Sequence, residues 1–315
     1  MNNYITDIKT EVKKVIVGQE ELIDSILIAL ITNGHILVEG VPGLAKTTAI
    51  NAFSKALGVE FKRIQFTPDL LPSDIVGSQI YNQKESNFNV KKGPVFTNLL
   101  LADEINRAPA KVQSALLEVM QEKQVTIGDN SFKVGDPFLV MATQNPVEQE
   151  GVYKLPEAQL DRFMLKVVVN YNTIEEEFEI VNRVSKIGFQ TINQVIDQQA
   201  IKILQEKVHQ VHVDDEIQRY ILKLIFATRE PQNYGLEQYS SYIEVGASPR
   251  ASIDLYNASR AVALIRGKEY VTPLDIATVA TNVLQHRIVL SYQATAKNIT
   301  PKDIVQKILG TIPTP

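Results

Sequence analysis

The chain has 315 residues, of which 44% are hydrophobic and 22% are charged, and its formal net charge is −4. These values are ordinary for a globular protein of about two domains, and they exclude a disordered chain. The slight acidic excess offers no general attraction for nucleic acid, and the absence of cysteine excludes disulfides, thiolate zinc sites and cysteine nucleophiles.

The start of the chain lacks the apolar stretch and the small-residue cleavage site of a secretory signal, so we expect a cytoplasmic protein. The longest aliphatic run, ILIALI at residues 26–31, is much shorter than the roughly 20 apolar residues that cross a bilayer. We therefore expect that this is not a membrane protein and that the run lies in a buried helix.

From Glu20 the apolar residues recur at helical spacing, and the residues Asn-Gly-His at 33–35 end this helix. Five short apolar runs then predict buried strands, at residues 36–40, 61–66, 98–104, 138–144 and 164–170. Helical stretches, notably residues 47–57 and 110–122, separate these runs. The alternation predicts an α/β domain with a parallel sheet.

Two polar segments, residues 77–96 and 124–134, do not fit a minimal βαβ repeat. The second contains the turn Gly-Asp-Asn between alternating residues and predicts a β-hairpin. Both are polar enough to project from the body, where they could contact partners. After Asn170 the strand signal ends, and the rest of the chain predicts a small helical bundle with helix starts at Asp214, Ser248 and Thr272.

A near match to a phosphate-binding loop lies at residues 40–48, with Ala45 in place of the second glycine of GxxxxGK[ST]. Such a loop points backbone N–H groups at phosphate oxygens. Lys46 and Thr47 fall on the first turn of the next helix, where a cation is unfavourable unless an anion is near. Ala45 is tolerable if its φ stays negative, and a simple turn before a helix is the alternative interpretation.

Two acids, Asp103 and Glu104, follow the apolar strand that ends in Ala102. Ligands of open parallel sheets gather at the carboxyl ends of the strands, so both acids should face the phosphate loop. Asp103 is predicted to hold Mg²⁺ through water, with Thr47 as a direct ligand, and Glu104 to deprotonate the water that attacks the γ-phosphate. The alternative is a solvated strand end.

Further polar residues could act at the γ-phosphate. Asn145 follows another strand and could hold the attacking water, or it could cap a turn. Arg107, Arg162 and Arg250 are candidates for stabilising the charge on the transferring phosphoryl group. Arg250 lies at the start of a predicted helix, which calls for an anionic neighbour. Arg162 could reach the nucleotide of a neighbouring subunit, or it could form an ion pair with Asp161 or Glu157.

Five segments together resemble the MoxR family of AAA+ ATPases: VGQEE at 17–21, GVPGLAKT at 40–47, LLLADEINRAPAKVQSALLEVMQE at 99–122, ATQNPVEQEGVYKLPEAQLDRF at 142–163 and GASPRA at 246–251. Alanine before the lysine is familiar in that family. The resemblance implies an α/β fold, with an AAA+ P-loop αβα core and a parallel sheet followed by a small C-terminal helical lid domain. The expected boundaries are residues 1–188 for the core and 189–315 for the lid.

The resemblance also implies a role for each matching residue. The Walker A residues are Gly40, Val41, Pro42, Gly43, Leu44, Ala45, Lys46, Thr47 and Thr48. Asp103 and Glu104 match Walker B, Asn145 matches sensor 1, Arg162 matches the arginine finger, Arg250 matches sensor 2, and Val17 and Gly18 are expected near the adenine. Residues 77–96 and 124–134 look like the helix-2 insert and the hairpin before sensor 1 that mark the clade shared with magnesium chelatase subunits.

The family implies ATP and Mg²⁺ as cofactors and a homo-oligomer, expected as a hexameric ring with ATP between subunits, in which Arg250 could serve either its own or a neighbour's site. Such proteins act as chaperones on client complexes, commonly with a separate partner that carries a von Willebrand factor A domain. No nucleic acid partner is expected. The alternatives are a nucleotide-gated assembly module, a magnesium-chelatase-type metal-insertion motor, and a helicase-loader-like machine, which the acidic charge disfavours.

Overall fold

The computed structural model describes residues 2–146, 151–188 and 190–315. The chain folds into two compact units. The first unit contains Met1–Leu155 and Val167–Lys202, and the second contains Pro156–Lys166 and Ile203–Pro315. The expected boundary between residues 188 and 189 remains a prediction, and Phe189 lies outside the described residues.

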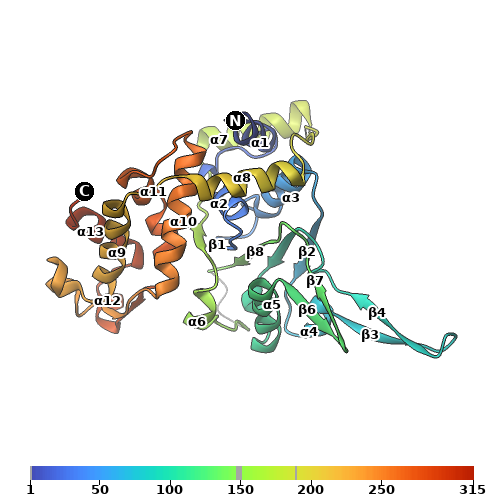
Figure 1. Ribbon diagram of the computed structural model, residues 1–315. Helices are drawn as coiled ribbons and strands as arrows, with labels where there is room; N and C mark the ends of the chain where they lie inside the picture. Colours follow the sequence, from blue (N-terminus) through green and yellow to red (C-terminus); the bar gives the residue numbers. More distant parts are fainter. Residues whose placement is uncertain (1, 147–150, 189) are drawn as a thin grey trace. The chain divides into compact units, whose positions relative to one another are not determined.

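A five-stranded sheet with the strand order β2-β5-β8-β1-β9 forms the centre of the α/β fold (Figure 1). Its strands are β1 (Ile36–Glu39), β2 (Phe61–Gln65), β5 (Leu99–Asp103), β8 (Leu139–Gln144) and β9 (Leu165–Val168). The pairs β2–β5, β5–β8 and β8–β1 are parallel. All five strands lie where the apolar runs predict them, and the first four residues of β5 are fully buried, as expected for a covered parallel sheet.

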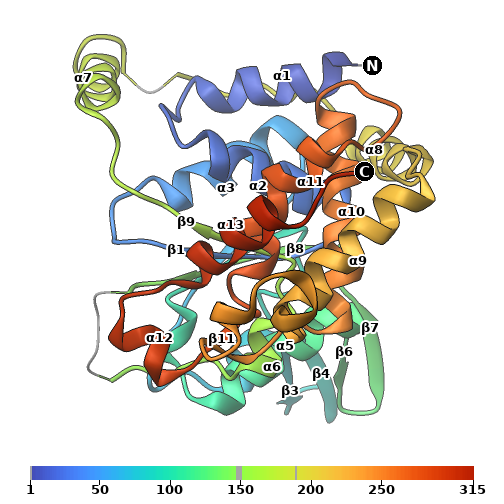
Figure 2. The ribbon, with the colours of Figure 1, turned by 90° about the vertical axis from the view of Figure 1, so that its left-hand side faces the viewer.

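Helices cover both faces of this sheet. On one side lie α1 (Asn2–Lys13), α2 (Glu20–Ile31) and α3 (Lys46–Leu57), and on the other lies α5 (Ala110–Glu122) (Figures 1 and 2). Sequence periodicity predicts α2, α3 and α5, whereas α1 was not predicted and packs on α3. The remaining helices of this unit are α4 (Pro72–Val76), the short η1 (Ile105–Arg107), α7 (Ile174–Asn182) and the π-helical turn η2 (Arg183–Ile187).

Two antiparallel hairpins extend from the sheet-bearing unit (Figure 1). The strands are β3 (Gly77–Asn82) with β4 (Asn87–Lys92), and β6 (Gln124–Ile127) with β7 (Asn130–Lys133). The second hairpin confirms the prediction for residues 124–134. The first shows that the polar segment at 77–96 is also a hairpin.

The second unit is mainly helical. Its helices, including α8, which begins in the first unit, are α6 (Glu157–Leu160), α8 (Gln198–Gln210), α9 (Asp215–Arg229), η3 (Pro231–Tyr234), η4 (Glu237–Tyr239), α10 (Pro249–Ile265), α11 (Pro273–Leu284), α12 (Tyr292–Ala296) and α13 (Pro301–Thr311). α10 and α11 pack along each other, and α9 packs on α10 and α13.

The expectation that only helices follow Asn170 is wrong in one detail. β10 (Ile243–Val245) and β11 (Val289–Leu290) form a small antiparallel pair. Strands of two or three residues are too short to produce a period-two pattern. Among the described helices, none has both the length and the apolar character that a membrane crossing requires.

Candidate nucleotide site

The phosphate-binding loop runs from the end of β1 to the start of α3, as the sequence predicts. Two of its positions require glycine. A Cβ atom on Gly40 would lie 2.8 Å from the carbonyl oxygen of Val169, and Gly43 has φ 89°. Because of these two glycines, the loop can bend tightly and pass close to the neighbouring backbone.

Ala45, the residue before α3, has φ 55° and ψ 16°, so the expectation of a negative φ is wrong. The chain enters the helix through a left-handed residue, a geometry that a glycine adopts without cost. An alanine in this conformation costs about 1–2 kcal/mol. The loop therefore holds local strain at the position where the usual pattern has glycine.

Lys46 is the first residue of α3, and its Nζ donates a hydrogen bond to the carbonyl oxygen of Gly40 at 2.6 Å. Burial lowers the pKa of Lys46, and the nearby carboxylates of Asp103 and Glu104 partly offset that effect. The predicted cation therefore lies close to both predicted acids.

A cavity of about 320 Å³ lies in front of this helix start. Its lining consists of Pro42, Gly43, Ala45, Lys46, Thr47, Thr48, Arg63, Asp103, Glu104, Thr143, Gln144 and Asn145. The structure thus brings the predicted Walker A, Walker B and sensor 1 residues to one place, while Val41 and Leu44 belong to the same loop. The chemical role of each residue remains a prediction.

Strand register explains why three polar side chains meet at this edge of the sheet. Gln65 is the pairing partner of Asp103, and Ala102 is the partner of Ala142, the residue before Thr143. β5 lies between β2 and β8. Parallel strands end at the same edge, so Gln65 and Thr143 flank Asp103 on its two sides.

The carboxylate of Asp103 has two partners. Arg63 donates to Oδ2 from Nη2 at 2.6 Å and from Nε at 3.1 Å. Thr143 Oγ1 donates to Oδ1 at 2.6 Å and accepts the backbone N–H of Glu104 at 2.9 Å. Thr143 therefore fixes the predicted metal ligand and the backbone of the predicted base at the same time.

Glu104 has a left-handed backbone, with φ 57° and ψ 49°. Its carboxylate accepts hydrogen bonds at Oε2 from Gln65 Nε2 at 2.7 Å and from Arg107 Nη1 at 2.9 Å. Arg107, one candidate for the phosphoryl charge, thus pairs with Glu104. A non-glycine residue with positive φ costs energy, and it often marks a functional position.

Asn145 is buried and directly follows β8. The adjoining residues 147–150, which belong to the family-like motif at 142–163, lie outside the described residues.

Val17 and Gly18 lie near the start of the chain, between α1 and α2. Val17 O accepts a hydrogen bond from Asn172 Nδ2 at 3.0 Å, and Gly18 has φ 67°. Their expected location near the adenine remains a prediction.

Arg162 and Arg250 both belong to the second unit. Arg250 lies in the first turn of α10, whose N-cap Ser248 accepts the backbone N–H of Arg250 at 3.1 Å. Its Nη1 lies 3.6 Å from Asp161 Oδ2. The anionic neighbour that the sequence predicts for Arg250 is therefore a carboxylate of the same unit. Arg162 follows Asp161 directly in the sequence.

The sequence did not predict that Arg63, Gln65 and Thr143 are parts of the site. Arg63 and Gln65 are two residues apart on β2 and therefore face the same side of the strand. Two long polar side chains on one face of a strand were a signal that could have indicated a site. Thr143 gave no such signal, because only the pairing of β5 with β8 brings it to Asp103.

Comparison with known proteins supports this fold. Residues 35–165 match the "ATPase family associated with various cellular activities (AAA)", and residues 239–308 match the AAA lid domain. These matches define the class as an AAA ATPase with a lid domain.

Related proteins identify the family within this class. The chain is 49% identical over 305 residues to Chaperone MoxR1 of Mycobacterium tuberculosis, a match that covers 97% of this chain and 81% of that protein. It is 27% identical over 326 residues to Protein MoxR of Methylorubrum extorquens, covering 97% and 93% of the two chains. The chain belongs to the MoxR family of AAA+ ATPases.

A crystal structure from Cytophaga hutchinsonii has the same fold. The TM-score is 0.94 at 50% identity, and the superposition covers 100% of this chain and 96% of the other. The likeness therefore extends over the core unit and the helical unit alike.

Proposed function

We propose that this protein binds and hydrolyses MgATP in the cavity at the start of α3, and that it does so in a homo-oligomeric ring that remodels a client complex. The observation that supports the proposal is the lining of one cavity by Lys46, Thr47, Asp103 and Glu104. The oxygens of a polyphosphate there would accept hydrogen bonds from the backbone N–H groups of the loop and from the ammonium of Lys46.

The cavity also suits a magnesium ion. The Thr47 hydroxyl and the Asp103 carboxylate are oxygen ligands of the kind that Mg²⁺ prefers, and both line the cavity. When bound, the ion would supply positive charge to the phosphates. Glu104 would then take the proton of the attacking water, and Asn145 would orient that water.

Three of the contacts that hold the two carboxylates are expected to change before this chemistry. Arg63 holds the Asp103 oxygen Oδ2, and Gln65 and Arg107 hold Glu104 Oε2. Glu104 can accept a proton from water only when its carboxylate faces that water. We therefore expect nucleotide binding to rearrange these partners.

The decisive experiment combines calorimetry with phosphate release. Glu104→Gln should keep MgATP affinity and lower turnover by about 10²–10⁴-fold, the usual share of a general base. Lys46→Ala should lose affinity. The controls are Glu118→Gln, which is exposed on α5, and Lys55→Ala, which is exposed at the other end of α3.

The outcomes separate the candidate functions. No heat with MgATP would refute nucleotide binding. Binding without turnover, with or without a client, would instead favour a nucleotide-gated assembly module. Unchanged turnover in Glu104→Gln would remove Glu104 from the role of base.

Family membership supports three further proposals, which concern the oligomer, the partner and the client. A relative named a chaperone supports a protein client, and we propose that a separate protein with a von Willebrand factor A domain takes part. Native mass measurement with MgATP tests the ring. A pull-down with Glu104→Gln, held in its ATP state, would identify the client, whereas salt-sensitive DNA binding would revive the nucleic-acid alternative.

A further inference from the structure

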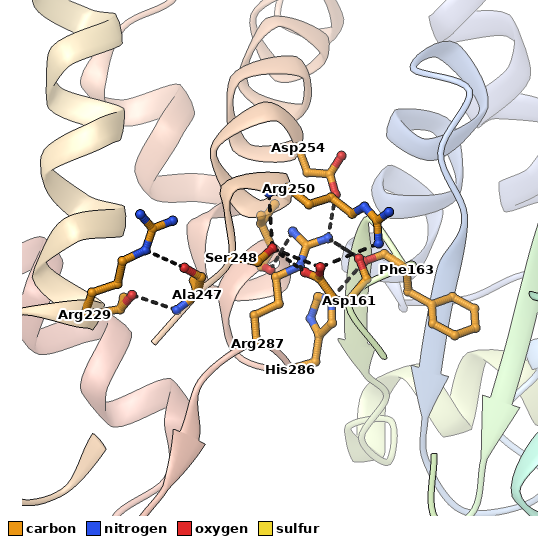
Figure 3. Close-up of polar contacts among 11 residues, drawn as sticks. Asp161, Phe163, Arg229, Ala247, Ser248, Arg250, Asp254, His286 and Arg287 are labelled. Carbon is orange, nitrogen blue, oxygen red and sulfur yellow. Dashed lines mark hydrogen bonds and ion pairs between the residues drawn. The ribbon is translucent and has the colours of Figure 1, made fainter. Parts of the chain in front are cut away.

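The backbone that carries Arg162 is held within the second unit by residues that follow α11 (Figure 3). Arg287 Nη2 donates to the carbonyl oxygen of Asp161 at 3.1 Å and to that of Phe163 at 2.9 Å. These carbonyls lie immediately before and after Arg162. One guanidinium therefore fixes both sides of the residue that we expect to act as the arginine finger.

The two residues before Arg287 bind the same segment. His286 Nε2 lies 2.9 Å from the carbonyl oxygen of Phe163, and Gln285 Nε2 donates to that of Lys166 at 2.7 Å. Burial keeps the pKa of His286 well below its usual value, so the ring is neutral at pH 7. Its Nε2 must then carry the proton, because a carbonyl oxygen can only accept. Three consecutive side chains thus bind the backbone around Arg162.

Arg287 is buried and forms ion pairs with two partly buried carboxylates. Its side chain is 1% exposed, its Nε lies 2.9 Å from Asp161 Oδ1, and its Nη2 pairs with Asp254. A buried guanidinium with two carboxylates and two carbonyls has its donors directed by its planar shape. A lysine could keep the charge but could not reproduce this set of bonds.

Asp161 links Arg287 to Arg250. Ser248 Oγ lies 2.9 Å from both carboxylate oxygens of Asp161, and Arg250 Nη1 lies 3.6 Å from Oδ2 (Figure 3). The carboxylate before Arg162 therefore also contacts the first turn of α10, which carries Arg250. The two arginines that are expected to meet phosphate share one anchor.

We propose that Arg287 is a positioning residue for Arg162 and Arg250. By fixing the two carbonyls beside Arg162 and the carboxylate that contacts Arg250, it makes both arginines parts of one rigid body, so that they change position together. This inference rests on the proposed ATPase function, in the form in which Arg162 and Arg250 both act on a neighbouring subunit's nucleotide.

The test uses the full chain and three variants. Arg287→Lys should keep MgATP affinity within about threefold of wild type and lower kcat by about 10–100-fold, because an arginine displaced by about 1 Å loses that much. Arg162→Ala measures the loss of the finger itself. Arg266→Lys is the matched control, because Arg266 pairs with the buried Asp275 in the same unit at 2.7 Å, and it should leave kcat unchanged.

Mixed rings separate positioning from general damage. A Glu104→Gln subunit has almost no turnover of its own but carries an intact Arg162. Mixing it with Arg287→Lys should therefore restore part of the lost turnover, as mixing it with Arg162→Ala should. A lid that is merely destabilised would also disturb its own subunit's site, and mixing would restore nothing.

Several results would overturn the inference. One such result is a wild-type kcat in Arg287→Lys when Arg162→Ala is inactive. Another is a loss of turnover in Arg287→Lys that mixing with Glu104→Gln subunits does not restore at any ratio, although the same mixing restores turnover to Arg162→Ala. Full turnover in Arg162→Ala would remove the premise, whereas absence of turnover in wild type would refute the proposed function itself. If Arg287→Lys does not fold, the isosteric Asp161→Asn takes its place, with the same pattern and a smaller loss expected.

Discussion

Thr143→Val should weaken both the fold and the proposed activity, because one hydroxyl serves both acids. Thr143 is 1% exposed, and valine matches its shape without its hydrogen bonds. The change removes a hydrogen bond to the Asp103 carboxylate, and such a bond typically contributes about 1.5–3 kcal/mol to stability. It also leaves the Glu104 N–H without its acceptor, which costs about 1–3 kcal/mol. We expect the free energy of unfolding to fall by about 3 kcal/mol.

Turnover should fall as well, by at least about tenfold. The left-handed backbone of Glu104 costs about 1–2 kcal/mol, and the bond from its N–H to Thr143 helps to hold it. Without that bond the backbone can relax and carry the Glu104 carboxylate away from the position where it would act as a base.

Urea unfolding and phosphate release measure the two effects. Thr143→Ser keeps the hydroxyl and loses one methyl group, so it should cost only about 1 kcal/mol and keep most of the turnover. Equal behaviour of the valine and serine variants in both assays would refute this reasoning.

Three further predictions concern backbone strain and pH. Ala45→Gly should raise the free energy of unfolding by up to about 1.5 kcal/mol, because about 1–2 kcal/mol of relieved strain outweighs about 0.4–1 kcal/mol of added chain entropy in the unfolded state. Ala49→Gly within α3 should lower the free energy of unfolding by about 1 kcal/mol or more. A change of the same sign in both variants, measured by urea unfolding, would contradict this account. Gly40→Ala should destabilise the protein in the same assay, since its Cβ would lie 2.8 Å from a carbonyl oxygen, and an unchanged midpoint would contradict that contact. His35, whose pKa burial lowers from 6.5 to about 4, contributes full stability above pH 6.5 and should lose about 1.4 kcal/mol per pH unit from there down to about pH 4. Urea unfolding at pH 7 and pH 5 should show a steeper loss of stability with falling pH in wild type than in His35→Gln, and equal slopes would exclude a contribution from His35.

The sequence by itself determined the elements and the polar residues at their ends. Strands with continuous apolar runs and helices with a 3.6-residue period leave local patterns, so the five strands, α2, α3 and α5 could be predicted. The carboxyl ends of parallel strands share one edge of a sheet, and this rule was enough to bring Asp103 and Asn145 to Lys46.

Only the tertiary structure decided which side chains hold these residues in place. Gln65 and Thr143 flank Asp103 because β5 pairs with β2 on one side and with β8 on the other, and strand order leaves no local pattern. The positive φ of Ala45 and Glu104 depends on how each strand passes into the next element. Arg287 meets Asp161 from 126 residues away, because the second unit packs the buried Arg287 against the partly buried Asp161. A charged residue outside every motif does not reveal in the sequence which partner it will have.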